Sequence, residues 1–150
     1  MFVGRVIREA RSVAGDDVPI HVYGAGDPCE LPLMAALGAD VFDSSSYVHF
    51  ARHGSYMTPY GALPDAARLL AGEYRCACPT CRRVAGPQEV FDDVTLLAAH
   101  NLWTICETVA RIRERLRRHE LHAWIEELLL VHRAWFPDSL LPASWEELHG

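Results

Sequence analysis

The chain contains no lysine, no long apolar run and no excess of positive charge. Each of these absences argues against a class of function. Its 14 basic residues are all arginine, and 20 acidic residues bring the formal net charge to −6. Because a negative protein repels polyanions, any contact with nucleic acid requires a local basic patch. No stretch approaches the ~20 apolar residues of a membrane span, and residues 1–5 open an amphipathic helix rather than a signal peptide. We therefore expect a cytoplasmic protein that contacts no membrane.

Cysteines are not spread along the chain as they are in a disulfide-rich secreted protein. Three of the five fall within six residues, where Cys76, Cys78 and Cys81 have the spacing C-x-C-x-x-C. A loop this tight lets three thiolates converge on one metal ion. His100 is the best candidate for the fourth ligand, and a hydrogen-bonded core histidine is the alternative. Zinc is favoured over an iron–sulfur cluster because no fourth cysteine lies nearby.

A metal site with three cysteines and one histidine is expected to be structural. Four protein ligands leave no open position for water or substrate, so the ion would hold the second half of the chain together. The two remaining cysteines, Cys29 and Cys106, are expected to be buried small apolar residues without a chemical role.

Residues 19–43 are predicted to fold as a strand, a glycine loop, a short helix and a second strand. Residues 19–23 favour extended backbone, and Gly24-Ala25-Gly26 then allow a tight turn and the close approach of a ligand. Pro28 suits the start of a helix, and Gly38 stands where a helix commonly ends.

The second predicted strand, residues 39–42, leads directly into Asp43. In parallel α/β folds the loops at the C-terminal ends of the strands converge, and the chemistry lies there. Asp43 and the glycine loop are therefore expected to face one site. Alternatively Asp43 caps the segment that follows, because an aspartate before the serines of residues 44–46 is a good helix N-cap.

Apolar residues recur at helical spacing in three longer segments. We predict an N-terminal helix over residues 3–13, the longest helix over residues 94–118, and a further helix over residues 121–132. The apolar stripe of the longest helix is expected to consist of Ala98, Leu102, Ile105, Val109, Ile112 and Leu116. Between these segments we expect short helices over residues 47–52 and 65–70 and a brief extended piece over residues 56–61.

Five arginines crowd the end of the longest predicted helix. They are Arg111, Arg113, Arg115, Arg117 and Arg118. The cluster could be a nucleic-acid patch, but a solvated helix face is the preferred interpretation, because Glu107 stands four residues before Arg111 and supports an ion pair.

Five motifs, in this order, resemble those of the tRNA-guanine transglycosylases, and most of all the archaeosine-type branch. The motifs are HVYGAGDP, LGADVFDSSSY, YMTPYG, CACPTC and AAHNLW, and the resemblance covers residues 19–118. A related branch inserts 7-deazaguanines into DNA, so either tRNA or DNA is implied as the partner, together with a 7-deazaguanine base.

The family is a zinc-containing (β/α)8 barrel that exchanges a guanine in nucleic acid for a 7-deazaguanine. The resemblance implies that Asp43 is the nucleophile of a double displacement, in which a carboxylate divides one substitution into two. It also implies that Gly24, Ala25 and Gly26 bind the base. The implied zinc ligands are Cys76, Cys78, Cys81 and His100, which agrees with the spacing.

The implied fold class is α/β, namely the C-terminal portion of a TIM barrel with an inserted zinc-binding subdomain and C-terminal helices. Residues 1–72 would form the partial barrel with the nucleophile, residues 73–118 the zinc subdomain and long helix, and residues 119–150 a C-terminal helix and tail.

A complete barrel takes ~250 residues, so the 150 residues here match only its C-terminal part. Three interpretations follow: half of a split enzyme completed by a second chain or by a homo-oligomer, an inactive remnant, or a zinc-dependent nucleic-acid-binding module that uses Arg111 to Arg118. The retained Asp43 and glycine loop favour the split enzyme, because a binding module needs neither.

Overall fold

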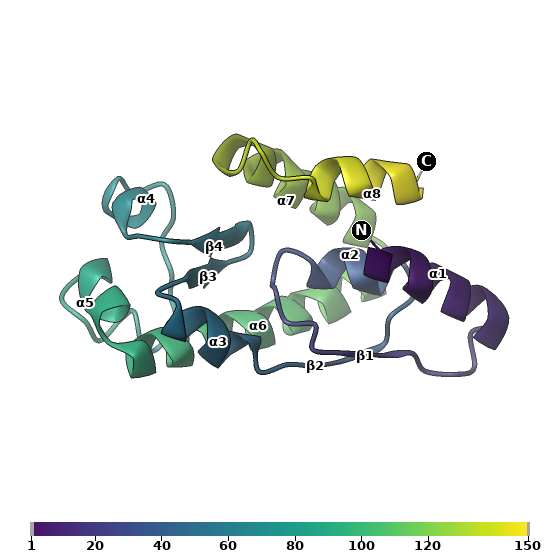
Figure 1. The fold of residues 1–150 in the computed structure, drawn as a ribbon, viewed down its shortest axis with the longest axis horizontal. Helices are drawn as coiled ribbons and strands as arrows, with labels where there is room; N and C mark the ends of the chain where they lie inside the picture. The colour runs from purple at the N-terminus through teal and green to yellow at the C-terminus, as the bar shows by residue number, and fades with distance from the viewer. Residues whose placement is uncertain (1, 150) are drawn as a thin grey trace.

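The computed structural model describes residues 2–149 as a mixed α/β protein. The helices are α1 (Phe2–Ala14), α2 (Leu31–Ala36), α3 (Ser46–Arg52), α4 (Ala67–Leu70), α5 (Pro87–Asp92), α6 (Val94–Arg117), α7 (Leu121–Trp135) and α8 (Leu141–His149). The strands are β1 (His21–Tyr23), β2 (Val41–Asp43), β3 (Tyr56–Thr58) and β4 (Gly61–Leu63). The long helix α6 passes through both halves of the molecule, with α3, α5 and the β3–β4 pair at its start and α2 with the β1–β2 pair further along (Figure 1).

The predicted strand, glycine loop, helix and second strand of residues 19–43 are confirmed. Strands β1 and β2 are parallel, with Val22 opposite Phe42 and Tyr23 opposite Asp43. Helix α2 buries its leucines and methionine against the core, and Gly38 follows it with φ +111°, a conformation that side chains rarely adopt. This unit therefore brings the ends of the two strands side by side.

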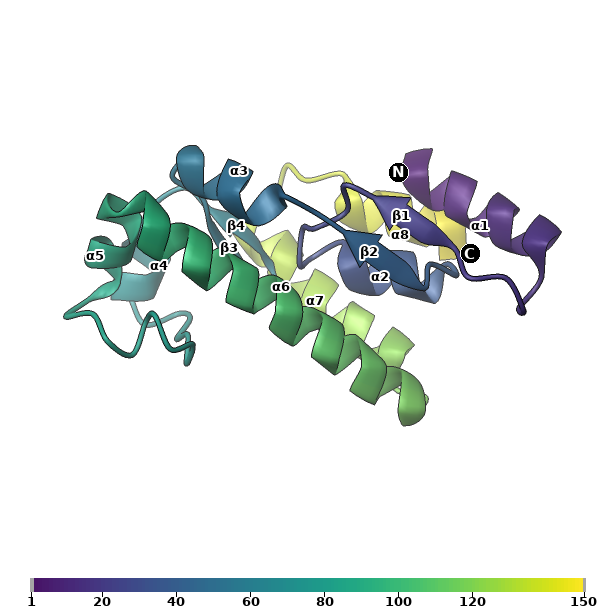
Figure 2. The same ribbon diagram turned by 90° about the horizontal axis from the view of Figure 1, so that it is seen from below.

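The parallel pair has no further strand beside it among the described residues. Tyr23 on β1 is 78% exposed and Val41 on β2 is 46% exposed. A groove of about 280 Å³ follows the open side of β2, where Val41 and Phe42 meet Val109 and Leu116 of α6. Apolar side chains thus lie beside the unpaired edge of β2. Figure 2 shows β1 and β2 side by side.

The extended piece expected over residues 56–61 is one half of an antiparallel hairpin, because β4 pairs with β3. Its turn closes at Gly61, which has φ +136° and packs against Phe136, the C-cap residue of α7. Helix α5 was not predicted, although Pro87 at its first position is a usual signal for a helix start.

Helix α6 begins where predicted, and Asp93 caps it by accepting from the backbone N–H groups of Thr95 and Leu96 at 2.7 and 3.1 Å. The predicted apolar stripe is confirmed only in part, since Ile112 is buried but Leu102 and Leu116 are 43% and 49% exposed. The buried stripe instead consists of Leu97, His100, Asn101, Thr104, Thr108 and Ile112. The polar members tolerate burial because each makes hydrogen bonds within the fold, which apolar periodicity does not reveal.

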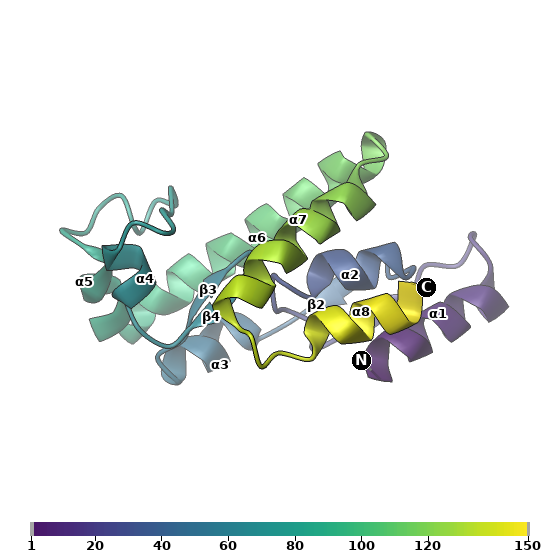
Figure 3. The ribbon, with the colours of Figure 1, turned by 90° about the horizontal axis from the view of Figure 1, so that it is seen from above.

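The core consists of two apolar clusters joined by α6. One lies among α1, α2, α7 and α8, and the other among α3, β3, β4, α5 and the cysteine loop. Helix α8 lies in the segment that was expected to be a C-terminal tail, and it buries Trp145. It runs back beside α1, so that both ends of the described chain lie close together (Figure 3). The division at residues 72 and 118 stays a prediction. None of the described helices is long and apolar enough to span a membrane.

Candidate functional site

The structure brings Cys76, Cys78, Cys81 and His100 together at the start of α6. Each of the three Sγ atoms lies 3.5 Å from His100 Nδ1, and the four candidate ligand atoms all lie within 4.8 Å of one another. Tetrahedral coordination with metal–sulfur bonds of about 2.3 Å and metal–nitrogen bonds of about 2.0 Å sets sulfur and nitrogen about 3.5 Å apart. The cluster therefore has the donor set and the spacing to bind a tetrahedral metal ion.

The cysteine loop is shaped by hydrogen bonds to its own sulfur atoms. The backbone N–H of Cys78 donates to Cys76 Sγ at 3.4 Å, and that of Cys81 donates to Cys78 Sγ at 3.3 Å. A hydrogen bond from the Cys81 thiol lowers the pKa of Cys76 well below that of a free thiol. Because the thiolate is the form that binds metal, this contact favours coordination by Cys76.

Contacts behind the ligands fix the orientation of His100. Its Nε2 donates to the carbonyl of Met57 at 2.8 Å, which leaves the lone pair on Nδ1, facing the three thiols. Tyr56 stacks on the imidazole at a ring-centroid distance of 3.6 Å, and its hydroxyl lies 3.2 Å from Cys81 Sγ. Strand β3 is therefore the outer support of the cluster.

Sequence reasoning did not identify Asn101, the residue after His100. Its side chain is fully buried, and it bonds to the backbone of Met57, Tyr47 and Ser55. The available signal was the polar pair His-Asn inside the apolar run AAHNLW, since two adjacent polar residues on the buried part of a helix need partners.

Asp43 lies at the C-terminal end of β2 beside the glycine loop. Its Oδ1 accepts from the N–H of Gly24 at 3.2 Å, and its Oδ2 lies 3.5 Å from His21 Nε2. The side chain is 54% exposed. The N-cap of α3 is Ser45, so the alternative in which Asp43 caps this helix is wrong, and its carboxylate faces the glycine loop instead.

The glycine loop needs its glycines for two different reasons. Gly24 has φ +72°, which favours glycine, whereas a Cβ added at Gly26 would lie 2.2 Å from Ser44 Oγ. The close approach at Gly26 joins the loop after β1 to the segment after β2, so the loop and Asp43 belong to one surface.

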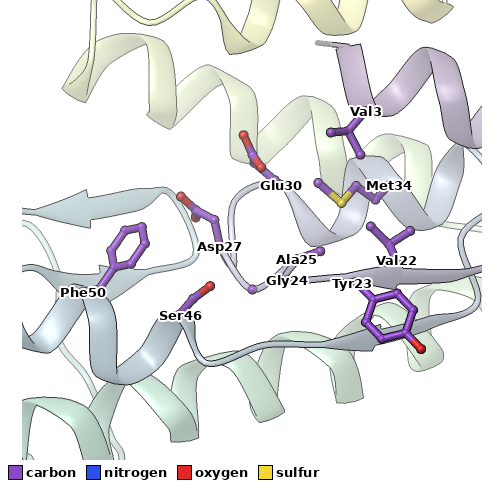
Figure 4. Close-up of a pocket in the computed structure, with 11 residues that line it drawn as sticks. Val3, Val22, Tyr23, Gly24, Ala25, Asp27, Glu30, Met34, Ser46 and Phe50 are labelled. Atoms are coloured by element: carbon purple, nitrogen blue, oxygen red, sulfur yellow. The ribbon is translucent and has the colours of Figure 1, made fainter.

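A pocket of about 380 Å³ opens on this surface (Figure 4). Its lining includes the glycine loop, Ser46 and Phe50 of α3, and the side chains of Asp27 and Glu30. Asp43 is not part of the lining and borders the pocket through Gly24. The predicted base-binding residues and the predicted nucleophile are thus neighbours.

The two acidic residues of the pocket were not predicted. Burial raises the pKa of Asp27, although the N–H of Cys29 donates to its Oδ1 at 3.0 Å. Burial, and next the charge of Asp27, raise the pKa of Glu30. Both carboxyls therefore hold a proton more readily than free ones do.

The remaining predicted features fall outside this surface. Cys29 is buried as expected, but Cys106 is exposed on α6, which corrects the prediction for that residue, since it lies off the buried stripe. In the arginine cluster, Arg111 pairs with Glu107 at 3.0 Å and Arg118 with Glu114 at 2.7 Å. These pairs agree with a solvated helix face.

Comparison with known proteins identifies the relatives of this chain. The family model described as queuine tRNA-ribosyltransferase matches residues 3–134. The tRNA-guanine(15) transglycosylase of Pyrococcus abyssi is 37% identical over 133 residues, which are 85% of this chain and 22% of the relative. That of Aeropyrum pernix is 38% identical over 120 residues, 76% of this chain and 22% of the relative.

The tRNA-guanine(15) transglycosylase of Methanopyrus kandleri is 34% identical over 140 residues, which cover 89% of this chain and 29% of that protein. This chain thus spans about a fifth of the length of the first of these relatives. The family match covers most of its residues, including both strand ends and the metal cluster. The chain belongs to the queuine tRNA-ribosyltransferase family.

Proposed function

We propose that this chain is the C-terminal part of a tRNA-guanine transglycosylase whose remaining barrel strands come from another polypeptide. The observation that carries the proposal is the position of Asp43 beside the glycine loop, at the adjoining C-terminal ends of two parallel strands. In parallel α/β folds this is where catalytic groups lie. The relatives are named for action on guanine 15 of tRNA, which favours tRNA over DNA as the substrate.

In the proposed reaction the Asp43 carboxylate attacks the anomeric carbon of the ribose at the target guanosine. The bond from that carbon to the base breaks, and its electron pair leaves with guanine, so that the sugar stays attached to Asp43. A 7-deazaguanine then attacks the same carbon, releases the carboxylate and loses its proton. The phosphodiester backbone is not broken.

Chain residues around Asp43 have defined roles in this scheme. The N–H of Gly24, 3.2 Å from Oδ1, holds the carboxylate at the strand end. The 380 Å³ pocket offers backbone groups of Gly24, Ala25 and Gly26 to a heterocycle that side chains would otherwise keep away. Asp27 and Glu30 add to its lining carboxyl groups that accept or donate a hydrogen bond.

We propose zinc as the ion held by Cys76, Cys78, Cys81 and His100, because three cysteines and one histidine are a usual structural zinc set. Zinc would fix the cysteine loop to α6 and β3. It takes no part in the reaction, because four protein ligands leave no position for substrate.

The partner polypeptide is inferred from the open side of the parallel pair. A full (β/α)8 barrel needs ~250 residues and closes its sheet. Here the open edge of β2 and the groove lined by Val41, Phe42 and Leu116 would receive a strand of the missing half. A nucleic-acid-binding module without catalysis is less well supported, because three of the five clustered arginines form ion pairs within the chain.

The nucleophile is tested by exchange of labelled guanine into tRNA with the partner polypeptide present. Asp43→Asn is expected to reduce exchange at least about 10³-fold while zinc content stays the same, because an amide is a poor nucleophile. Asp16→Asn, at an exposed aspartate before β1, is the matched control and is expected to keep full activity. Equal exchange by wild type and Asp43→Asn would remove Asp43 from the role.

A further inference from the structure

Two adjacent residues of α6 hold one residue of β3 from both sides of its backbone. His100 Nε2 donates to the carbonyl of Met57 at 2.8 Å, and the N–H of Met57 donates to Asn101 Oδ1 at 2.9 Å. All three residues have an exposed fraction of 0%. A candidate metal ligand and its neighbour therefore share a single anchor point in β3.

The other end of the Asn101 amide reaches α3. Its Nδ2 donates to the carbonyls of Tyr47 at 3.2 Å and Ser55 at 3.0 Å. One N–H donor and two carbonyl acceptors surround the amide, so its orientation is set, because a flipped amide would place its oxygen against two carbonyl oxygens. Asn101 thus joins the metal-bearing part of α6 to both ends of the α3 segment.

Helix α3 begins three residues after Asp43, and the short link between them is tied to it. The N–H of Ser46 donates to Ser44 Oγ at 2.9 Å, and Ser44 in turn packs against Gly26. Figure 2 shows α3 along the start of α6, between the end of β2 and the β3–β4 hairpin. Tyr47 is therefore linked to Asp43 by a short segment, and Ser44 in this segment contacts the glycine loop.

We propose that Asn101 is a positioning residue through which metal binding at the cysteine cluster orders the segment from Asp43 to Tyr47. An ion on Nδ1 holds the imidazole in the orientation that keeps Nε2 on the Met57 carbonyl. When the ion is lost, the hydrogen bond from His100 to Met57 weakens and β3 becomes mobile. Asn101 then shifts with Met57, and its hydrogen bond to the Tyr47 carbonyl weakens as well. The meaning of this link for catalysis rests on the proposed function of Asp43, whereas the link itself does not.

Hydrogen exchange measured by mass spectrometry tests the link on the full chain, loaded with zinc or treated with a chelator. In wild type we expect chelation to speed amide exchange over residues 44–52 at least about fivefold, the effect of losing a buried hydrogen-bond partner. Faster exchange restricted to residues 74–84 after chelation would overturn the proposal. This comparison needs no variant.

Asn101→Leu separates a linking role from a merely structural one. In this variant we expect the amides of residues 44–52 to exchange rapidly both with and without zinc. The ratio of the exchange rate after chelation to the rate with zinc therefore falls to about one. A merely structural residue would raise both rates and keep the wild-type ratio, and that result would overturn the proposal. Asn101→Asp, nearly the same size, is expected to act in the same direction, because its carboxylate faces two carbonyl oxygens.

Thr108→Val is the matched control. Thr108 is also buried on α6, but its hydroxyl donates only to the carbonyl of Thr104 within the same helix, at 2.8 Å. We expect it to keep the wild-type ratio of exchange rates. Zinc affinity, measured by competition with a chelator, is expected to fall about 10- to 100-fold in Asn101→Asp, because Met57 supports the ligand histidine, and to stay unchanged in Thr108→Val.

Neither measurement depends on base exchange. If Asp43→Asn keeps full activity while chelation still loosens residues 44–52, the proposed function fails and the link stands. If Asp43→Asn is inactive and chelation leaves these residues unchanged, the link fails and the proposed function stands.

Discussion

The metal cluster and the strand ends differ in how much of each site this chain supplies. All four candidate ligands, the Met57 carbonyl behind His100 and the stacked Tyr56 come from residues 56–100. The surface around Asp43, by contrast, has two strands, an open edge and an aspartate that is half exposed. One region is completed by contacts within this chain, whereas the other, under the proposed function, needs strands that the described residues do not contain.

The largest expected effect comes from the closed region. Cys78→Ser removes the fully buried cysteine of the cluster, so we expect loss of zinc and loss of protection over residues 74–100. Zinc is measured by elemental analysis and protection by hydrogen exchange. Cys106→Ser, at an exposed cysteine, is the control and should keep both. Zinc at full stoichiometry in Cys78→Ser would show that this region is not closed by the metal.

The open region is tested by Val41→Asp, which places a charge on the groove beside β2. We expect at least about a tenfold loss of partner-dependent exchange, because a buried unpaired charge opposes association, and no change in zinc content. Val13→Asp, on the 88%-exposed valine of α1, should leave exchange as it is. Full activity of Val41→Asp would mean that the partner covers another surface.

Gly26→Ala tests the junction between the two strand ends. A Cβ would lie 2.2 Å from Ser44 Oγ, so we expect a loss of about 1–3 kcal/mol in the free energy of unfolding, measured with urea. Replacing Ser44 by glycine in the same chain should restore much of the lost free energy of unfolding. Gly86→Ala, with no atom within 4 Å of its Cβ, should cost less than about 1 kcal/mol. Equal losses at the two sites would refute the close packing.

The smallest expected effect concerns Asp27. Because burial raises its pKa above the ordinary 3.8, its contribution to stability is present at low pH and is lost as pH rises through the raised value. Asparagine stays neutral, so Asp27→Asn should gain stability relative to wild type as the pH rises above the ordinary pKa of 3.8. Urea unfolding as a function of pH measures it, with the exposed Asp17→Asn as control. A difference that does not change with pH would contradict the burial of this carboxyl.

The sequence predicted what depends on spacing. The C-x-C-x-x-C loop, the glycines around β1 and the helical periodicity of α7 all have local causes, and the structure agrees with the elements they indicate. These features are fixed by residues only a few positions apart. The resemblance to a family added an expected role for Asp43.

The sequence could not reveal what depends on long-range partners. Asn101, Thr104 and Thr108 lie outside the apolar stripe predicted for α6, yet they are buried, because β3, α3 and the helix itself supply their hydrogen-bond partners. The prediction that Cys106 is buried is wrong for the same reason. The face of α6 that is buried differs from the face that its apolar residues indicate, and Cys106 lies outside it. Asp27 carried no signal, because its burial comes from the surrounding fold.

The most direct test of the account is labelled-guanine exchange into tRNA by the zinc-loaded chain, alone and with lysate from its source as a supply of the missing half. We predict no exchange by the chain alone and exchange after the addition, with wild-type chain required and Asp43→Asn inactive. Exchange by the purified chain alone would contradict the account, because these residues would then form a complete catalytic site without further strands.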